Sequence, residues 1–410
     1  MYNMKKSVSL FLAAGLLLAA RLLFAGQFAA ADTAREITSE ASFGVPQIVS
    51  GTLRRMTDRN TETAMQVGQV KEPVVNITMK GDPCAAVYIE FGNNIMPFTV
   101  QVKEGGGWVE IASWDEPYAQ AYVEFPAQTQ FRLRFETGGK YKNLYIREIY
   151  LFGEGERNDT PQIWEPPCEK ADLLLLVAHP DDELLWFGGL LPTYAGERGL
   201  NVQVCYLTCG NSCRRVELLN GLWHCGVRNY PDIGDFEDIK SYDASKLYPK
   251  WGGTGAVDLY VARLLRRYQP EVAVTQALDG EYGHAAHVVC ARSMSRACEL
   301  AADPEYDPES AALWGVWTGK KVYLHKGDSP TLTMDWRQPL SAFGGKTGFE
   351  VTEEAYLLHM SQPHDKNGKK SLYYITPEDD ENSSFVYTLI YSTVGEDVLG
   401  GDMFENVPLP

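Results

Sequence analysis

Two short runs of the chain carry side chains that could bind one metal ion together. Residues 178–183 read Ala-His-Pro-Asp-Asp-Glu, and residues 280–287 read Gly-Glu-Tyr-Gly-His-Ala-Ala-His. These runs hold three of the 7 histidines in the chain. His179 and Asp182 lie three residues apart and could bind one cation between them. Because a neutral imidazole and a carboxylate together suit Zn²⁺, the sequence predicts a zinc site.

Helix capping is the alternative explanation for the first run. Asp181 or Asp182 could cap a helix that begins near Glu183. Capping needs only one acid, however, and it does not explain His179 or the three neighbouring carboxylates, which repel one another without a cation. If His179, Asp182 and one histidine of the second run bind the same ion, a fourth position stays open for water. Such an open position is typical of catalytic zinc sites.

Both runs follow segments that read as buried strands. Residues 173–177 (Leu-Leu-Leu-Leu-Val) and 272–275 (Val-Ala-Val-Thr) are short and apolar, as parallel strands buried on both faces are. Further strand-like and helix-like segments alternate with them, at 202–207, 214–225, 257–268 and 287–301. This alternation predicts a doubly wound, Rossmann-like α/β fold. In such folds ligands bind beyond the carboxyl ends of the strands, which is where both runs lie.

The chain before this region has a different pattern. From 35 to 156, short runs of aromatic and β-branched residues recur about every ten residues between turn signals, which predicts an all-β sandwich or jelly roll. Residues 157–170 contain three prolines and read as a linker, so we expect the α/β domain to span 171–410.

The first 31 residues predict export. Two lysines precede an apolar run, and three alanines at 29–31 offer a cleavage site, as in a secretory signal peptide. An uncleaved membrane anchor is the alternative. We therefore expect a secreted or cell-surface protein, in which some of the 8 cysteines could form disulfides. Cys205, Cys209 and Cys213 do not have the spacing of structural zinc sites.

The two histidine-bearing runs resemble the PIG-L (LmbE-like) N-acetylglucosaminyl deacetylase family. The resemblance covers about residues 171 to 362. It implies that His179, Asp182 and His287 bind one Zn²⁺ ion, that Asp181 is the general base, and that His284 assists the leaving amine or the oxyanion. Further matches are Leu207-Thr208-Cys209-Gly210, Arg214 with Glu217, and His359-Met360-Ser361-Gln362.

The same resemblance implies that Arg214 and Asp235 bind substrate. Arg215 and Asp232 lie close by in the sequence and are alternatives for these two roles. Many family members carry Gly or Pro where this chain has Ala285, a change that leaves both imidazoles of the second run in place.

The all-β region resembles the discoidin-type, galactose-binding-like modules of exported carbohydrate enzymes. Family members often read Thr-Asp-Gly-Asn where this chain has Arg59 as the third residue. Binding of a glycan, binding of calcium and a purely structural role all remain open. The matching segments are 35–38, 56–58, 88–91 and 146–153.

Together these features predict an exported zinc-dependent deacetylase of N-acetylglucosamine-type sugars or glycans. There are two alternatives: a zinc amidase that acts on another amide, and a glycan-binding protein whose catalytic domain is inactive. The net charge is −17, from 37 basic and 54 acidic residues, which argues against nucleic acid as a partner. The sequence does not predict an oligomeric state.

Overall fold

The computed structural model describes residues 32–46, 48–50, 53–362 and 381–408. The predicted signal peptide, residues 1–31, lies outside this described part of the chain. Within the described ranges, every helix is too short or too polar to span a bilayer.

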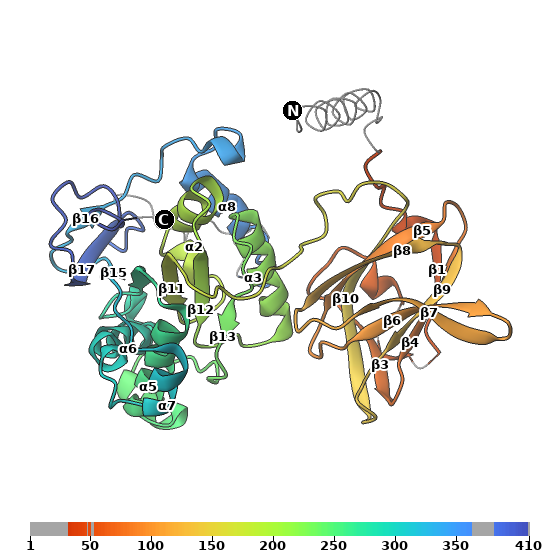
Figure 1. Ribbon diagram of the computed structural model, residues 1–410, viewed down its shortest axis with the longest axis horizontal. Helices are drawn as coiled ribbons and strands as arrows, with labels where there is room; N and C mark the ends of the chain where they lie inside the picture. Colours follow the sequence, from red (N-terminus) through yellow and green to blue (C-terminus); the bar gives the residue numbers. More distant parts are fainter. Residues whose placement is uncertain (1–31, 47, 51–52, 363–380, 409–410) are drawn as a thin grey trace, which may run out of the picture.

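The N-terminal region, here called the β-domain, consists of two five-stranded antiparallel sheets (Figure 1). Their facing sides pack around an aromatic core in which Phe91, Phe98 and Trp114 are in ring contact. One sheet has the order β1 (Ala41–Gly44), β4 (Val74–Met79), β9 (Gln130–Phe135), β6 (Phe98–Glu104), β7 (Gly107–Trp114). The other has the order β2 (Ile48–Ser50), β3 (Met65–Val70), β10 (Lys142–Phe152), β5 (Cys84–Phe91), β8 (Gln120–Gln128). Two 3-10 turns, η1 (Thr38–Glu40) and η2 (Leu53–Met56), complete it.

The C-terminal region, here called the α/β domain, has one seven-stranded mixed sheet. The predicted parallel arrangement holds for its first five strands, whereas an antiparallel edge of two strands was not predicted from the sequence. The parallel strands, in order, are β13 (Asp232–Ile233), β12 (Val202–Tyr206), β11 (Leu173–Val177), β14 (Val272–Thr275) and β15 (Lys321–His325). The antiparallel strands are β17 (Val386–Ser392) and β16 (Leu332–Thr333).

Helices cover both faces of this sheet. Leu174 and Leu176 of β11 pack into one apolar cluster with α5 (Thr254–Tyr268) and α6 (Ala285–Ala302). Leu173 and Leu175 pack into the other cluster with α3 (Ser212–His224) and α8 (Gly348–Tyr356). Successive side chains of a strand point to opposite faces, so a continuous apolar strand supplies two cores. The helices are α2 (Asp182–Leu185), α3 (Ser212–His224), α4 (Ala244–Leu247), α5 (Thr254–Tyr268), α6 (Ala285–Ala302), α7 (Pro308–Trp314) and α8 (Gly348–Tyr356). The described chain also contains a π-helical segment, η3 (Pro192–Glu197), and the 3-10 turns η4 (Tyr248–Trp251), η5 (Glu281–Gly283) and η6 (Ser341–Phe343).

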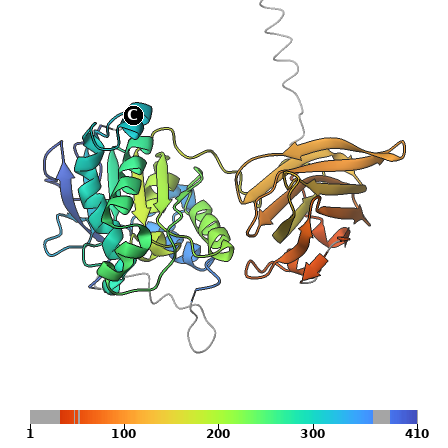
Figure 2. The same ribbon diagram turned by 90° about the horizontal axis from the view of Figure 1, so that it is seen from below.

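The β-domain packs directly against the α/β domain. Helix α3 lies on the side that faces the β-domain in both views (Figures 1 and 2). Trp164, in the segment predicted as a linker, is only 6% exposed and its ring contacts Trp223 and Tyr230 at centroid distances of 5.4 and 5.6 Å. Its indole nitrogen donates a hydrogen bond to Gln120 of β8. The connecting segment is therefore part of a packed interface.

All 8 cysteines are unpaired in this structure. Cys205 is buried in β12, and no cysteine belongs to the group of clustered histidines that could hold a metal ion within the described residues.

Candidate active site

The turn after β11 brings His179 and Asp182 together. The Asp182 carboxylate accepts a hydrogen bond from the backbone N–H of His179 at 2.7 Å and lies 3.1 Å from Nδ1 of the same residue. Asp181, the residue just before α2, has a backbone φ of +106°, a strained value for any residue other than glycine. Its side chain makes no capping hydrogen bond to α2. Helix capping therefore does not explain the acid at position 181.

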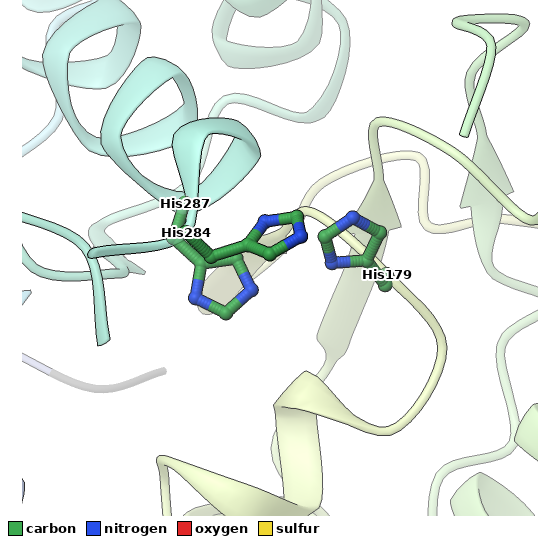
Figure 3. A group of neighbouring side chains, drawn as sticks. All are labelled: His179, His284 and His287. Carbon is green, nitrogen blue, oxygen red and sulfur yellow. The ribbon is translucent and has the colours of Figure 1, made fainter. Parts of the chain in front are cut away.

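The second run begins after β14 and ends in the first turn of α6. Gly280, at φ +71°, leaves no room for a side chain, because a Cβ atom there would lie 2.8 Å from the His284 carbonyl oxygen. His284 precedes α6 and His287 lies one turn later, so both imidazoles point toward His179 (Figure 3). The ligand atoms of these three histidines all lie within 4.8 Å of one another.

These side chains form a donor set that fits a divalent cation. His287 Nε2 is buried, makes no hydrogen bond within the described chain, and lies 3.2 Å from Asp182 Oδ1. A buried imidazole nitrogen without a partner costs free energy unless a ligand satisfies it. His179, Asp182 and His287 thus converge as the resemblance implied, and His284 lies within reach of the same point. Imidazole and carboxylate are ligands that Zn²⁺ binds in proteins, and a set of two imidazoles and one carboxylate leaves a fourth position open.

A buried carboxylate orients His287 from behind. Glu281 Oε2 lies 2.8 Å from His287 Nδ1, and its other oxygen lies 2.6 Å from Nδ1 of His325. The side chains of Glu281, His287 and His325 are all 0% exposed. Because Nδ1 of His287 is engaged by Glu281, Nε2 is the nitrogen left to face the cluster. Such outer partners fix the orientation of metal-binding histidines.

The charges around the site favour a bound cation. Although burial opposes ionisation of His287, the carboxylates of Asp182 and Glu281 raise its pKa to about 10. Burial, together with the neighbouring His179 and His287, lowers the pKa of His284 to about 3, so this ring is neutral at pH 7. Burial raises the pKa of Asp181 to about 7, with Arg214 opposing and Asp182 adding to the shift.

The cluster opens into a cavity of about 560 Å³, here called the catalytic cavity. Arg214 of α3 reaches its floor, 3.1 Å from Asp181 and 3.5 Å from Asp238. With its amide nitrogen facing Asp181, Gln362 donates to that carboxylate at 2.9 Å and accepts from Arg214 Nε at 3.2 Å. The cavity is also lined by Leu185, Trp186, Lys240, Tyr242, Tyr282 and Tyr356.

Residues 174–298 match the PIG-L family. The description of this family is GlcNAc-PI de-N-acetylase, and the matched segment contains both histidine-bearing runs and α3. A deacetylase of Catenulispora acidiphila, named 1D-myo-inositol 2-acetamido-2-deoxy-alpha-D-glucopyranoside deacetylase 1, is 29% identical over 215 residues. That match covers 46% of this chain and 65% of the relative.

Two further comparisons concern proteins with related names. A deacetylase of the same name from Saccharopolyspora erythraea is 31% identical over 152 residues, covering 28% of this chain and 50% of the relative. The chain therefore spans less than two thirds of the length of both curated relatives. Among solved structures, the N,N'-diacetylchitobiose deacetylase from Pyrococcus horikoshii is similar with 18% identity and a TM-score of 0.38, covering 48% of this chain and 73% of that one.

Within residues 174–298, the structure separates the residues that the resemblance assigned to substrate binding. Arg214 lines the catalytic cavity, whereas Arg215 lines a neighbouring cavity. Asp235 also lines that second cavity, and Asp238 is the acid that lies beside Arg214. Asp232 faces neither cavity, because its carboxylate binds Tyr260 and Tyr268.

Sequence reasoning missed three residues of the site. Asp238 lies in a loop without regular spacing, so nothing in the sequence distinguishes it from Asp235. Gln362 was noted only as part of a matching segment. His325 ends β15, the strand beside β14, so the rule that sites form at the carboxyl ends of parallel strands would have found it.

Proposed function

We propose that this chain is a zinc-dependent deacetylase that hydrolyses the N-acetyl group of N-acetylglucosamine-type sugars. The observation that carries the proposal is the convergence of His179, Asp182 and His287 beside the buried carboxylate of Asp181. The names of the curated relatives support it, because both are deacetylases of a 2-acetamido sugar.

Zn²⁺ would be held by His179, Asp182 and His287. When bound, it supplies Lewis-acid chemistry, which acidifies water and polarises the amide carbonyl. Asp181 accepts the proton of the attacking water, since its carboxylate lines the catalytic cavity beside Asp182 and a carboxylate can act as a general base. Arg214 and Gln362 hold that carboxylate at a fixed position. The same proton can then pass to the departing amine.

His284 acts on the carbonyl oxygen of the substrate. Its ring is neutral, and Nδ1 is buried without a hydrogen-bond partner among the described residues. A neutral imidazole can donate one N–H to an oxygen on which negative charge develops. The products are acetate and a free amino sugar.

The remainder of the catalytic cavity suits a sugar ring. Asp238 and Lys240 offer an acceptor and donors for hydroxyl groups. Tyr242, Tyr282 and Trp186 offer aromatic surface, on which the apolar face of a pyranose can pack. This mixture of few polar and several aromatic groups is common in small-molecule sites.

We further propose that the protein is exported and that its β-domain contacts a glycan. The support is the N-terminal run of residues 1–31 and the resemblance of residues 35–156 to galactose-binding-like modules.

Acetate release and metal content test the proposed function. The purified protein should contain about one zinc per chain and release acetate from N-acetylglucosamine derivatives. The His287→Ala variant should lose both metal and activity while it stays folded, and His224→Ala, at an exposed pair with Glu354, should lose neither. Turnover of simple amides without any sugar preference would replace the proposal with a general zinc amidase. Absence of metal from the folded protein would refute it.

A further inference from the structure

A buried glutamate of α3 binds the chain segment that ends in Gln362. The side chain of Glu217 is 0% exposed. One of its carboxylate oxygens accepts a hydrogen bond from the backbone N–H of Ser361 at 2.6 Å, and the other accepts from the hydroxyl of the same serine at 2.6 Å. The backbone N–H of Gln362 donates to the His359 carbonyl at 3.1 Å, which closes a turn over residues 359–362. Glu217 therefore fixes this turn through two hydrogen bonds to one residue.

The last residue of this turn contacts the proposed general base. Gln362 lines the catalytic cavity, where its amide N–H donates to Asp181 Oδ2 at 2.9 Å and its amide oxygen accepts from Arg214 Nε at 3.2 Å. Because Ser361 and Gln362 are consecutive, a displacement of the Ser361 backbone also moves the amide that binds Asp181. Glu217 lies outside the described lining of the cavity and is linked to the base through the turn.

Helix α3 holds Asp181 by two routes. Arg214 and Glu217 are three residues apart in this helix, so they lie on the same side of it. Arg214 reaches Asp181 directly, at 3.1 Å. Glu217 reaches the same carboxylate through Ser361 and Gln362. Two neighbouring side chains of one helix thus determine where the base lies.

The β-domain also contacts the 359–362 turn. The hydroxyl of Thr61 lies 3.7 Å from the sulfur of Met360. The Thr61 carbonyl accepts a hydrogen bond from Cys213 Sγ at 3.6 Å, and this thiol lies 3.6 Å from Glu217 Oε1. The turn is therefore in contact with both α3 and the chain segment that precedes β3 of the β-domain.

The burial of an acid at position 217 indicates a role for its two oxygens. Removing a carboxylate from water costs free energy, so an apolar side chain of similar size would fill the same space at a lower cost. The two short hydrogen bonds to Ser361 offset this cost and define the orientation of the turn. An apolar side chain would instead leave the Ser361 N–H without this acceptor.

We propose that Glu217 is a positioning residue of the active site. By fixing Ser361, it holds the amide of Gln362 against Asp181, so that the Asp181 carboxylate stays directed at the attacking water. The inference rests on the proposed function and adds to it a residue that touches neither substrate nor metal.

A double-mutant cycle tests this role. Glu217→Leu removes both acceptors at similar volume and should lower kcat for acetate release from N-acetylglucosamine about 10- to 100-fold, with little change in KM or zinc content. Gln362→Ala should cause a similar loss. If Glu217 acts through Gln362, the double variant should be no slower than Gln362→Ala alone, whereas independent effects would multiply. Glu299→Gln, exposed on α6, is the control and should keep full turnover.

Hydrogen exchange gives a measurement that does not depend on activity. In a peptide that contains residues 357–362, the Ser361 N–H should exchange at least about tenfold faster in the Glu217→Leu variant than in the unaltered protein. Glu217→Gln keeps one oxygen as an acceptor for this N–H. It should therefore restore most of the protection from exchange and most of the turnover.

Ser361→Ala tests the same contact if Glu217→Leu does not fold. This variant keeps the backbone hydrogen bond to Glu217 but loses that of the hydroxyl, and should lower kcat about three- to tenfold, without adding to the loss in Gln362→Ala. Losses that multiply, or unchanged exchange in Glu217→Leu, would overturn the inference. If the protein hydrolyses another amide but no N-acetyl sugar, the proposed function fails, and the same cycle measured on that amide still decides the role of Glu217.

Discussion

At the scale of single residues, the site depends on one strained position. Asp181 adopts φ +106° at the end of β11, and this turn directs its carboxylate to Arg214 while Asp182 turns toward the histidines. Two adjacent acids thereby face different partners. A residue held in a strained conformation is stable only when its surroundings fix it, and here Arg214 and Gln362 do so.

The proposed role of Asp181 as a general base leads to the first prediction. Asp181→Asn should retain zinc and fold normally, but lose about two to four orders of magnitude in turnover, because an amide cannot accept a proton. Elemental analysis and acetate release measure the two properties. The control is Asp159→Asn, at an exposed site in the connecting segment. Near-normal turnover with zinc bound would leave Asp181 a purely structural role.

The carboxylate behind His287 leads to the second prediction. Glu281→Gln should weaken zinc binding about 10- to 100-fold, because the amide no longer fixes the orientation of the imidazole as a carboxylate does. Competition with a chromophoric chelator measures zinc affinity, and a thermal scan without metal reports folding. Glu299→Gln, exposed on α6, is the matched control. Unaltered affinity in the Glu281 variant would show that the Glu281–His325 pair only fills the core.

At the scale of elements, strands β5 and β10 of the β-domain bring two carboxylates into a buried environment. Glu90 and Glu148 are paired across these strands. Burial raises the pKa of each to about 7, while Gln120 at Glu90 and Arg59 at Glu148 oppose the shift. One oxygen of Glu90 has no hydrogen-bond partner within the described residues. The ionised form of Glu90 is therefore disfavoured in the folded state.

This environment predicts a pH-dependent cost to stability. The pKa of Glu90 rises on folding from its ordinary 4.5 to about 7, so stability decreases as pH rises between these values and stays lower above them. Glu90→Gln removes that cost and should be more stable than the unaltered protein by about 1–3 kcal/mol at pH 8, with little difference at pH 4.5. Urea unfolding at both pH values measures the difference. Glu124→Gln, exposed on β8, should show no such change.

Local sequence patterns predicted the strands that precede the residues proposed to bind the metal. The apolar runs 173–177 and 272–275 became β11 and β14, since a strand buried on both faces needs apolar side chains throughout. Because both histidine-bearing runs follow the carboxyl ends of these strands, the sequence alone predicted that His179 and His287 lie close together. The antiparallel edge of β16 and β17 was missed, because pairing between distant segments depends on tertiary packing and leaves no periodic signal in the sequence. Asp238, which lies beside Arg214 in the catalytic cavity, was not singled out either, because the position of a residue in an irregular loop also depends on tertiary packing.

At the scale of the whole molecule, the two domains form one packed unit through α3. This helix carries Arg214 in the catalytic cavity, and its first turn is bound by Arg147 of the β-domain. The domain boundaries at 156 and 171 stay predictions, but the connecting segment between them is not a free tether.

The interface leads to the fourth prediction. Arg147→Ala should reduce the free energy of unfolding by roughly 1–3 kcal/mol, because Thr61 and Ser212 lose a charged hydrogen-bond donor. Turnover should fall as well, since the first turn of α3 positions Arg214. Denaturant unfolding and acetate release measure both effects, and the exposed Arg55→Ala serves as the control. If the Arg147→Ala variant were less stable but kept full turnover, the contact between the β-domain and α3 would have only a structural role.

The burial of Trp164 limits how this protein can be recombined with others. A chimera that joins a foreign β-domain at residue 156 keeps Trp164 with the α/β domain but removes Gln120, the acceptor of its indole N–H. It also replaces Tyr118, the aromatic neighbour of Tyr230. In such a chimera, Trp164 would lose its hydrogen-bond acceptor and Tyr230 its aromatic neighbour, and both side chains would become exposed to water. During evolution, the two domains can therefore be exchanged only if both faces of this interface change together.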